Sequence, residues 1–251
     1  MYNEKLGFTE EKIDDQHNLF IGAIPSQQSL WDRQHEQRGL RGLEGVALRN
    51  TPNDSAVYFE TFLSEHSTIL EVGSANGRDA RYWAYKGHSV ICLDFSSKAL
   101  EQLAEIATQQ DIRTRLFWYQ HDITSGELPM QLIPPDLLEG FYSRSSLHVD
   151  NETMLKLATQ IDSAIKPGGI ILIEGKSEDD EKIQRSEHLG NGLAIDRHEG
   201  GHIRRIWTQQ FIENMCNLNS WIIEDLNRVT NTTHGQTSVF IRLIAKKTII
   251  I

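Results

Sequence analysis

The stretch Thr68-Ile-Leu-Glu-Val-Gly-Ser-Ala-Asn-Gly77 carries the strongest signal of the fold. It joins a short apolar run, which ends at Val72, to a loop with a glycine at each end, and a helix-like segment from Arg78 to Tyr85 follows. A strand that ends in a glycine loop and leads into a helix is typical of an α/β sheet. Gly73 and Gly77 let the backbone turn sharply and approach a ligand without an intervening Cβ.

The alternation of apolar runs and amphipathic segments continues along the chain. We expect strands at 89–94, 115–119, 137–143 and 170–174, and helices after Ser96 and at 152–165. The run Ile170-Ile-Leu-Ile-Glu174 is apolar on both faces, as parallel strands covered by helices on both sides are. Two last strands, at 221–227 and 238–246, have no helix between them and predict an antiparallel hairpin. The pattern predicts a mostly parallel, doubly wound sheet with an antiparallel end.

Composition narrows the classes of partner. The chain of 251 residues has 25 Lys and Arg against 35 Asp and Glu, a formal net charge of −10, which disfavours nucleic acid and anionic membranes. No apolar stretch approaches the ~20 residues of a membrane span. Cys92 and Cys216 lie in apolar segments and fit a reduced compartment better than a disulfide scaffold. We therefore expect a cytoplasmic protein without nucleic-acid or membrane partners.

The glycine loop does not suit a phosphate-bearing ligand. A P-loop places Lys followed by Ser or Thr after its last glycine, whereas Arg78 and Asp79 stand there. A dinucleotide fingerprint needs a third glycine, and Asp79 would repel a pyrophosphate. The loop favours a cofactor that carries no phosphate.

Polar residues after the next two strands complete such a pocket, because ligands of open α/β sheets bind beyond the carboxyl ends of the strands. Asp94 is placed to accept both hydroxyls of a ribose, and Asp122, which follows His121, to receive an adenine amino group. Phe95 and Ile123 can enclose the adenine ring. S-adenosylmethionine has these groups and an amino-acid zwitterion, and no phosphate.

With these residues, the sequence resembles the class I S-adenosylmethionine-dependent methyltransferases. The matching stretches are Glu71-Val-Gly-Ser-Ala-Asn-Gly77, Asp94, His121-Asp122-Ile123 and Lys166-Pro-Gly-Gly-Ile-Ile-Leu-Ile173, within residues 55–246. The resemblance implies a Rossmann-like, doubly wound seven-stranded sheet of order 3-2-1-4-5-7-6, with the last-threaded strand antiparallel. Residues 1–50 are polar and Gln-rich and indicate an N-terminal arm or cap, so we expect the methyltransferase domain at 51–251. Ala75 departs from the family, which often has a glycine there.

A narrower resemblance concerns the acceptor. Tyr142-Ser-Arg-Ser-Ser-Leu-His148 and Gly201-His-Ile-Arg-Arg205 look like the tellurite-resistance and thiopurine-type small-molecule methyltransferases. That similarity implies that Ser143 and Arg144 line the cofactor pocket, that His148, His202 and Arg204 face the substrate, and that an arm carrying Trp31 covers the site. The function expected is methyl transfer to a small-molecule nucleophile.

The candidate residues fall into three sets. The expected cofactor-binding set is Glu71, Gly73, Ser74, Asn76, Gly77, Arg78, Asp94, Phe95, Ser96, His121, Asp122, Ile123 and Ser143. The expected substrate-binding set is Trp31, Arg144, His148, His202 and Arg204, and the candidate catalytic residues are His148, His202 and Arg144.

Several alternatives stay open at this level. His148 is a general base, a hydrogen-bond partner of the substrate, or a residue satisfied by Asp150 before the next helix. Arg144 either faces the cofactor or pairs with an acid such as Glu174. His198-Glu-Gly-Gly-His202 matches a zinc-protease pattern, but its two central glycines would cost roughly 2 kcal/mol in the helix that such a site requires. A loop over the site explains these residues better, and no metal is expected.

Two other function classes remain. One is a cofactor-binding regulatory or partner protein without transferase activity, which turnover on small molecules would separate from an enzyme. The other is a dinucleotide-dependent oxidoreductase, which nicotinamide cofactors would protect and S-adenosylhomocysteine would not.

Overall fold

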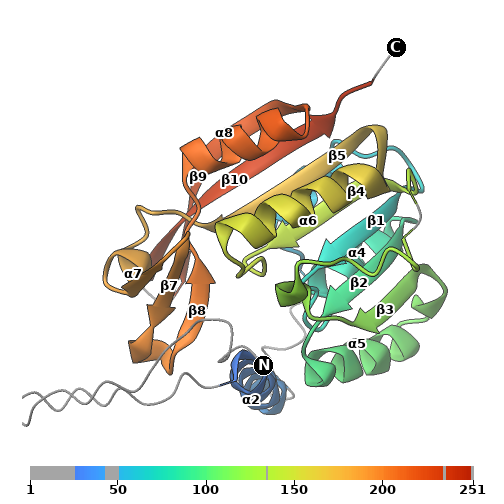
Figure 1. Ribbon diagram of the computed structural model, residues 1–251. Coiled ribbons are helices and arrows are strands. Elements are labelled where there is room, and N and C mark those ends of the chain that lie inside the picture. Colours follow the sequence, from blue (N-terminus) through green and yellow to red (C-terminus); the bar gives the residue numbers. More distant parts are fainter. Residues whose placement is uncertain (1–25, 43–50, 134, 234–235, 250–251) are drawn as a thin grey trace, which may run out of the picture.

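The computed structural model describes residues 26–42, 51–133, 135–233 and 236–249. Its centre is a seven-stranded sheet of order β3-β2-β1-β4-β5-β10-β9 (Figure 1). The strands are β1 (Thr68–Val72), β2 (Ser89–Asp94), β3 (Leu116–Gln120), β4 (Leu138–Arg144), β5 (Ile165–Lys176), β9 (Trp221–Thr233) and β10 (Gln236–Lys247). Strands β1 to β5 are parallel, and β10 runs antiparallel to both of its neighbours. The predicted order and the antiparallel last strand are confirmed.

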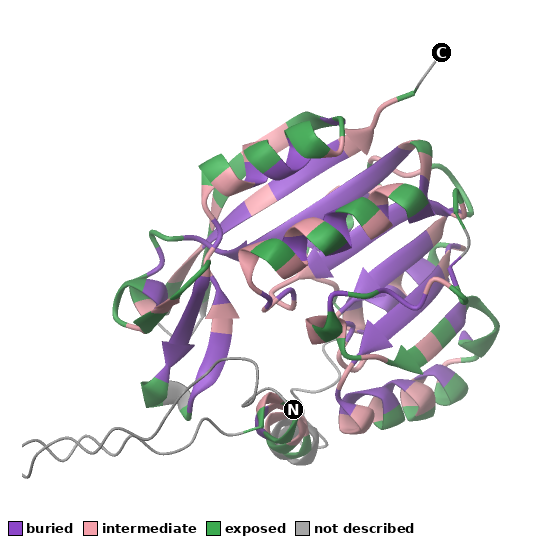
Figure 2. Cartoon of the chain, viewed as in Figure 1, coloured by how far each residue is buried: buried purple, intermediate pink, exposed green. Residues whose placement is uncertain are grey.

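Helices cover both faces of this sheet. On one face lie α6 (Asn151–Ala164) and α8 (Gln209–Leu218); on the other lie α3 (Asp54–Glu60), α4 (Arg78–Tyr85) and α5 (Ser97–Gln109). Short 3-10 turns η1 (Arg113–Arg115) and η2 (Ile123–Ser125) flank β3. Figure 2 shows the central strands buried and the outer faces of the helices exposed. Among the described helices, none is both long enough and apolar enough to cross a membrane.

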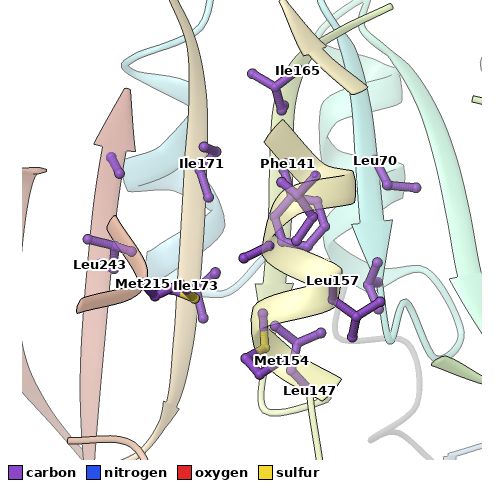
Figure 3. Close-up of a cluster of buried hydrophobic side chains, with 14 of the residues drawn as sticks. Leu70, Phe141, Leu147, Met154, Leu157, Ile165, Ile171, Ile173, Met215 and Leu243 are labelled. Atoms are coloured by element: carbon purple, nitrogen blue, oxygen red, sulfur yellow. The ribbon is translucent and has the colours of Figure 1, made fainter. Parts of the chain in front are cut away.

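The double burial of β5 explains its unbroken apolar run. Ile171 and Ile173 point into the core under α6 and α8, which Figure 3 shows, whereas Ile170 and Leu172 pack against the cluster under α3, α4 and α5. Successive side chains of a strand point to opposite faces, so a strand between two helix layers is apolar at every position. Both cysteines are free and buried, as expected from their apolar surroundings.

Capping side chains begin the helices that follow the strands. Ser96 accepts a hydrogen bond from the Ala99 N–H at α5, as predicted, and Asp150 accepts one from the Thr153 N–H at α6. Such a cap satisfies one of the backbone donors that a helix start leaves unpaired. The caps therefore fix where the chain turns at the carboxyl ends of β2 and β4.

The segment between β5 and α8 differs from the loop that we expected. It contains the short helix α7 (Glu181–Gln184) and a three-stranded antiparallel sheet of β6 (Glu187–Gly190), β7 (Leu193–Asp196) and β8 (His202–Arg205), with η3 (Arg197–Glu199) between the last two. Leu193, Ile195 and Ile203 form its own small core. Four-residue strands offer too few positions for a clear period of two, which is why the pattern was missed.

An N-terminal helix, α2 (Gln27–Gly42), lies within the predicted arm. It contacts both α5 and β8, and Figure 1 shows it between these two elements. The remaining parts of the predicted arm, 1–25 and 43–50, lie outside the described residues. The helix crosses the side of the sheet where the parallel strands end.

Candidate functional site

Backbone hydrogen bonds hold the glycine loop against the end of β2. The N–H groups of Gly73 and Ser74 donate to the Leu93 carbonyl at 2.7 and 3.2 Å. Gly73, Ala75 and Gly77 all have positive φ, at +77°, +50° and +70°. For a residue with a Cβ this conformation costs roughly 1–2 kcal/mol, so Ala75 stands where the backbone favours glycine.

The two glycines serve the packing of the chain itself. A Cβ on Gly73 would lie 2.0 Å from the Ser146 Cβ, and one on Gly77 would lie 2.3 Å from the Leu103 Cδ1. Gly73 therefore lets the loop lie against the turn after β4, and Gly77 lets α4 begin against α5. Sequence reasoning explained both glycines by a ligand and missed Ser146, because a contact between distant segments leaves no local signal.

Glu71, the residue before the last of β1, is a buried carboxyl, and its Oε2 has no hydrogen-bond partner among the residues that the structure describes. Burial raises its pKa well above the usual range, and the negative charges of Asp79 and Asp94 raise it further. The Ser74 hydroxyl on the same loop is also buried without a described partner. Buried polar atoms are normally hydrogen-bonded, so this pair fits a polar ligand that would supply the missing partners.

Asp94 joins three segments at the end of β2. Its Oδ2 accepts from the Ala75 N–H at 2.8 Å, and its Oδ1 accepts from the Ser96 N–H at 2.9 Å. The Ser96 hydroxyl in turn donates to Asp32 of α2 at 2.6 Å. Burial raises the pKa of Asp94, although backbone donors, with Ser96 and Ala75 foremost, oppose the rise. A carboxylate accepts about four hydrogen bonds, so this one retains acceptor capacity.

The polar residues after β3 make hydrogen bonds with residues close to them in the sequence. His121 Nε2 lies 2.7 Å from the Glu127 carbonyl oxygen. Asp122 is exposed and accepts from the Thr124 N–H, which caps η2. Ile123 packs against the main core. Contact of His121, Asp122 and Ile123 with an adenine stays a prediction.

Three further candidates on this edge are half-buried. Phe95 follows Asp94, and its carbonyl accepts from the side chains of Gln28 and Gln120. Asn76 lies on the glycine loop, and the Nε of Arg78 lies 3.5 Å from the Asp79 carboxylate.

Asp79 itself is buried and accepts from the Asn53 N–H at 2.8 Å, the Asn53 amide at 2.7 Å and the Tyr142 hydroxyl at 3.1 Å. It ties the segment before α3 to the start of α4. Asn53 belongs to no motif, and the motif that begins at Tyr142 does not indicate a contact with Asp79, so the sequence did not reveal this role.

The end of β4 adjoins the glycine loop. The Ser143 and Ser146 hydroxyls are 2.6 Å apart, and the Ser146 hydroxyl donates to the Val72 carbonyl at 2.6 Å. The turn after β4 is therefore fastened to the end of β1. The predicted cofactor residue Ser143 lies beside the glycine loop, which contains Gly73, Ser74, Asn76 and Gly77 of the same set.

Arg144 forms the ion pair that the sequence left open. Its Nε donates to the Glu174 Oε1 at 2.7 Å, and its guanidinium carbon lies 5.0 Å from the Phe240 ring centroid. The other carboxylate oxygen of Glu174 accepts from the Ser55 hydroxyl. The guanidinium is thus fixed at the carboxyl end of the sheet.

Three predicted substrate residues meet on the other side of the β4 end. The Trp31 ring of α2 stacks near the His148 ring, with centroids 6.1 Å apart and planes inclined by 13°. The same indole meets the His202 ring of β8 edge-on at 4.8 Å and lies 6.4 Å from the His35 ring. Arg204, two residues farther along β8, is half-buried.

Gln27 fastens α2 to β8. Its side-chain amide donates to the Gly201 carbonyl at 3.0 Å and accepts from the Ile203 N–H at 2.9 Å. Together with the Asp32–Ser96 hydrogen bond, this contact holds α2 at both sides of the site. The Gln-rich N-terminal segment gave no sign of this role.

His148 is not satisfied by Asp150, which caps α6 instead. Its Nδ1 accepts from the Arg205 backbone N–H at 3.3 Å. Burial, with the positive charges of Arg204 and His202 as the next causes, lowers the pKa of His148 to about 3. The imidazole is therefore neutral at physiological pH.

Arg205 is a residue that sequence reasoning missed. It is buried, donates to the Val149 carbonyl at 2.8 Å and the Asn151 side chain at 2.9 Å, and lies over the Trp207 and Phe211 rings. Burial lowers its pKa to about 9. It attaches β8 to the start of α6. In the Arg-Arg pair, the sequence alone did not distinguish this residue from Arg204.

The His198–His202 segment is not a helix. His198 is exposed on the η3 turn, and His202 begins β8, so the two imidazoles do not share a helical face. Within the described ranges, no group of three or more His, Cys, Asp or Glu side chains is arranged to hold a metal ion.

Comparisons with known proteins agree with this geometry. Residues 69–169 match the model of a methyltransferase domain family. No curated protein matches the sequence. An S-adenosylmethionine-dependent methyltransferase from Methanosarcina mazei is similar in structure, with a TM-score of 0.63 at 15% identity over 77% of this chain and 98% of that one.

Two further solved structures share the fold. TehB from Haemophilus influenzae has a TM-score of 0.59 at 13% identity, over 78% of this chain and 62% of that chain. The 1,6-didemethyltoxoflavin-N1-methyltransferase from Burkholderia thailandensis has a TM-score of 0.63 at 17% identity, over 95% of this chain and 99% of that one. The latter structure holds 1,6-didemethyltoxoflavin and S-adenosylhomocysteine.

Proposed function

We propose that this S-adenosylmethionine-dependent methyltransferase methylates a small-molecule nucleophile, which binds between α2, β8 and the turn after β4. The observation that carries the proposal is the meeting of Trp31, His148 and His202, from three separate segments, beside a β4 end that is fastened to the glycine loop. The Burkholderia enzyme, whose name and bound ligand identify a small acceptor, is similar over most of the chain.

The cofactor belongs on the edge formed by the ends of β1, β2, β3 and β4. Its amino-acid end would meet the unpartnered oxygen of Glu71 and the buried Ser74 hydroxyl, and its ribose would meet Asp94. The other residues proposed for this edge are Gly73, Asn76, Gly77, Arg78, Phe95, Ser96, His121, Asp122, Ile123 and Ser143. The strongest support comes from the polar atoms that the protein leaves buried and unpaired at this place.

Bound S-adenosylmethionine supplies a methyl group that its positive sulfur already activates. The task of the chain is to orient the acceptor and exclude water. Trp31 on α2 would cover the acceptor, with His148, His202 and Arg204 as its other neighbours. Arg144, fixed by Glu174, would set the electrostatic field beside the β4 end without transferring a proton.

The proposed division of the chain follows from the same contacts. Residues 51–251 form the methyltransferase domain and 1–50 form an arm or cap, of which α2 is the described part. The support for this is that α2 lies outside the sheet and is tied to it through Gln27 and Asp32.

Turnover tests the proposal directly. The protein is incubated with methyl-labelled S-adenosylmethionine and a panel of thiols, phenols, amines, aromatic nitrogen heterocycles and chalcogen oxyanions. We expect labelled small-molecule product with the unmodified protein and with Glu152→Ala, an exposed change on α6, and loss of product with Asp94→Ala.

Other results would favour the alternatives. Tight S-adenosylhomocysteine binding without transfer to any class would favour a cofactor-binding partner protein. Thermal protection by nicotinamide cofactors, and none by S-adenosylhomocysteine, would favour an oxidoreductase and contradict the account.

A further inference from the structure

His148 has two ring nitrogens in different surroundings. Nδ1 faces the β8 backbone, where the Arg205 N–H lies 3.3 Å away. Nε2 is buried and has no hydrogen-bond partner among the described residues. The ring also stacks near Trp31, which lies on the acceptor side of the site.

The Arg205 contact determines the tautomer. A backbone N–H can only donate, so Nδ1 must accept and cannot carry a proton. A neutral imidazole then carries its proton on Nε2. We propose that His148 is a fixed hydrogen-bond donor to the methyl acceptor through Nε2–H, and that it is not the general base. This inference rests on the proposed function, because only the proposed function places a methyl acceptor next to Nε2.

The charges around the ring agree with a neutral donor. From β8, His202, Arg204 and Arg205 place positive charge near the imidazole, and all three oppose its protonation. From α2, Trp31 presents an uncharged face, and His35 lies beyond that indole. On its own segment, the Ser145 carbonyl favours protonation, but it is outweighed by burial and the β8 cations.

The same surroundings select the class of acceptor. A donor at Nε2 together with the cations of β8 favours an acceptor that presents a lone pair or negative charge, such as a thiolate, a phenolate or an aromatic nitrogen. An electron pair of such an acceptor would form the bond to the methyl carbon while the carbon–sulfur pair returns to sulfur. A thiolate or phenolate has already lost its proton, and a pyridine-type nitrogen attacks through a lone pair that carries none. No proton has to leave, so the transfer needs no base at His148.

Nitrogen-resolved NMR of the ligand-free protein tests the tautomer without any activity. The His148 resonances are assigned by their loss in His148→Gln. We expect a protonated, pyrrole-type Nε2 and an unprotonated, pyridine-type Nδ1, unchanged between pH 5 and 8. A proton on Nδ1, or titration of the ring within this range, would overturn the inference.

Two substitutions then separate a donor from a base once an acceptor from the panel is in hand. His148→Phe removes the donor and should lower kcat/KM about 10- to 100-fold, the range for a hydrogen bond to a charged group. His148→Gln keeps an amide N–H at a similar reach and should recover most of that loss. If His148 were a base, His148→Gln would have a kcat/KM as low as that of His148→Phe. The unmodified protein would also lose activity at acidic pH, and this pH dependence would be absent from both variants.

Controls keep this result distinct from failure of the proposed function. His188→Gln, on the exposed strand β6, should leave kcat/KM unchanged. Calorimetry with S-adenosylhomocysteine should show unchanged affinity in both His148 variants, which also shows that they fold. If no variant binds that ligand, the proposed function fails; if all bind it and Gln does not exceed Phe, only the donor assignment fails.

Discussion

The two halves of the proposed site, one for the cofactor and one for the acceptor, are built in different ways. The cofactor half consists of the ends of parallel strands in one sheet, and its central carboxylate is held by backbone N–H groups of Ala75 and Ser96. The acceptor half consists of α2, β8 and one turn, joined by side chains such as Gln27 and Arg205. The first half is fixed by the main chain of the fold. The second depends on a few side-chain contacts between segments outside the central sheet, so changes in it should alter the acceptor and spare the cofactor.

Asp94→Ala should have the largest effect and should act on the cofactor half alone. The carboxylate would lose hydrogen bonds to the ribose and would also release the glycine loop at Ala75. We expect the Kd for S-adenosylhomocysteine to rise about 100-fold, because a hydrogen bond to a charged group contributes about 1.5–3 kcal/mol. Calorimetry measures this change, with Glu152→Ala as the control; an affinity within threefold of the original would refute the ribose assignment.

Glu71→Gln should separate stability from binding within the cofactor half. Burial raises the pKa of Glu71, so the folded protein binds this proton more tightly than the unfolded chain. The free energy of unfolding of the ligand-free protein should therefore fall as pH rises from the ordinary carboxyl range through the raised pKa. The amide removes this dependence and should add about 0.5–2 kcal/mol at neutral pH.

The same variant should bind S-adenosylhomocysteine more weakly, by about tenfold, since it lacks the charge that would meet an ammonium group. Denaturant unfolding at several pH values and calorimetry measure the two effects. If this variant were less stable than the original protein at neutral pH, Glu71 would not be a buried acid whose negative charge destabilises the fold.

Trp31→Ala tests the acceptor half of the site. Removal of the indole takes away its contacts with the His148 and His202 rings, and aromatic contacts of this kind contribute about 0.5–1.5 kcal/mol. We expect the KM for the acceptor to rise about 2- to 10-fold, with an unchanged Kd for S-adenosylhomocysteine. Steady-state kinetics measure the KM for the acceptor, and calorimetry measures the Kd for S-adenosylhomocysteine. A larger change in this Kd than in the KM would show that Trp31 does not belong to a separate acceptor half.

His198→Ala should have the smallest effect. The side chain is exposed on a turn and is not aligned with His202, so kinetics and cofactor affinity should stay within twofold of the original, as for most surface changes. Stoichiometric zinc in the purified protein, lost in this variant, would revive the metal interpretation.

The sequence grouped most residues of the proposed cofactor half and only part of the proposed acceptor half, for a physical reason. The apolar runs of β1 and β2 are easily recognised, and the carboxyl ends of parallel strands meet at one edge, so Glu71 and Asp94 could be grouped from their order alone. Ser143 was assigned to the same pocket through the family resemblance. Gln27 and Arg205 act through contacts across more than fifty residues of chain, which spacing does not record. Trp31 and the two histidines were found through a family resemblance, and the tautomer of His148 required the Arg205 amide.

We propose above all that the carboxyl ends of β1, β2 and β4 hold the cofactor while α2 and β8 hold the acceptor. Titration of nitrogen-15-labelled protein with S-adenosylhomocysteine, followed by NMR, tests it most directly. The account predicts that the amide signals of Gly73, Ala75 and Asp94 shift strongly and that the Trp31 indole N–H signal moves little until an acceptor is added. Two results would contradict this division of the site: signals of the glycine loop that do not shift, or a largest shift at Trp31 when S-adenosylhomocysteine alone is added.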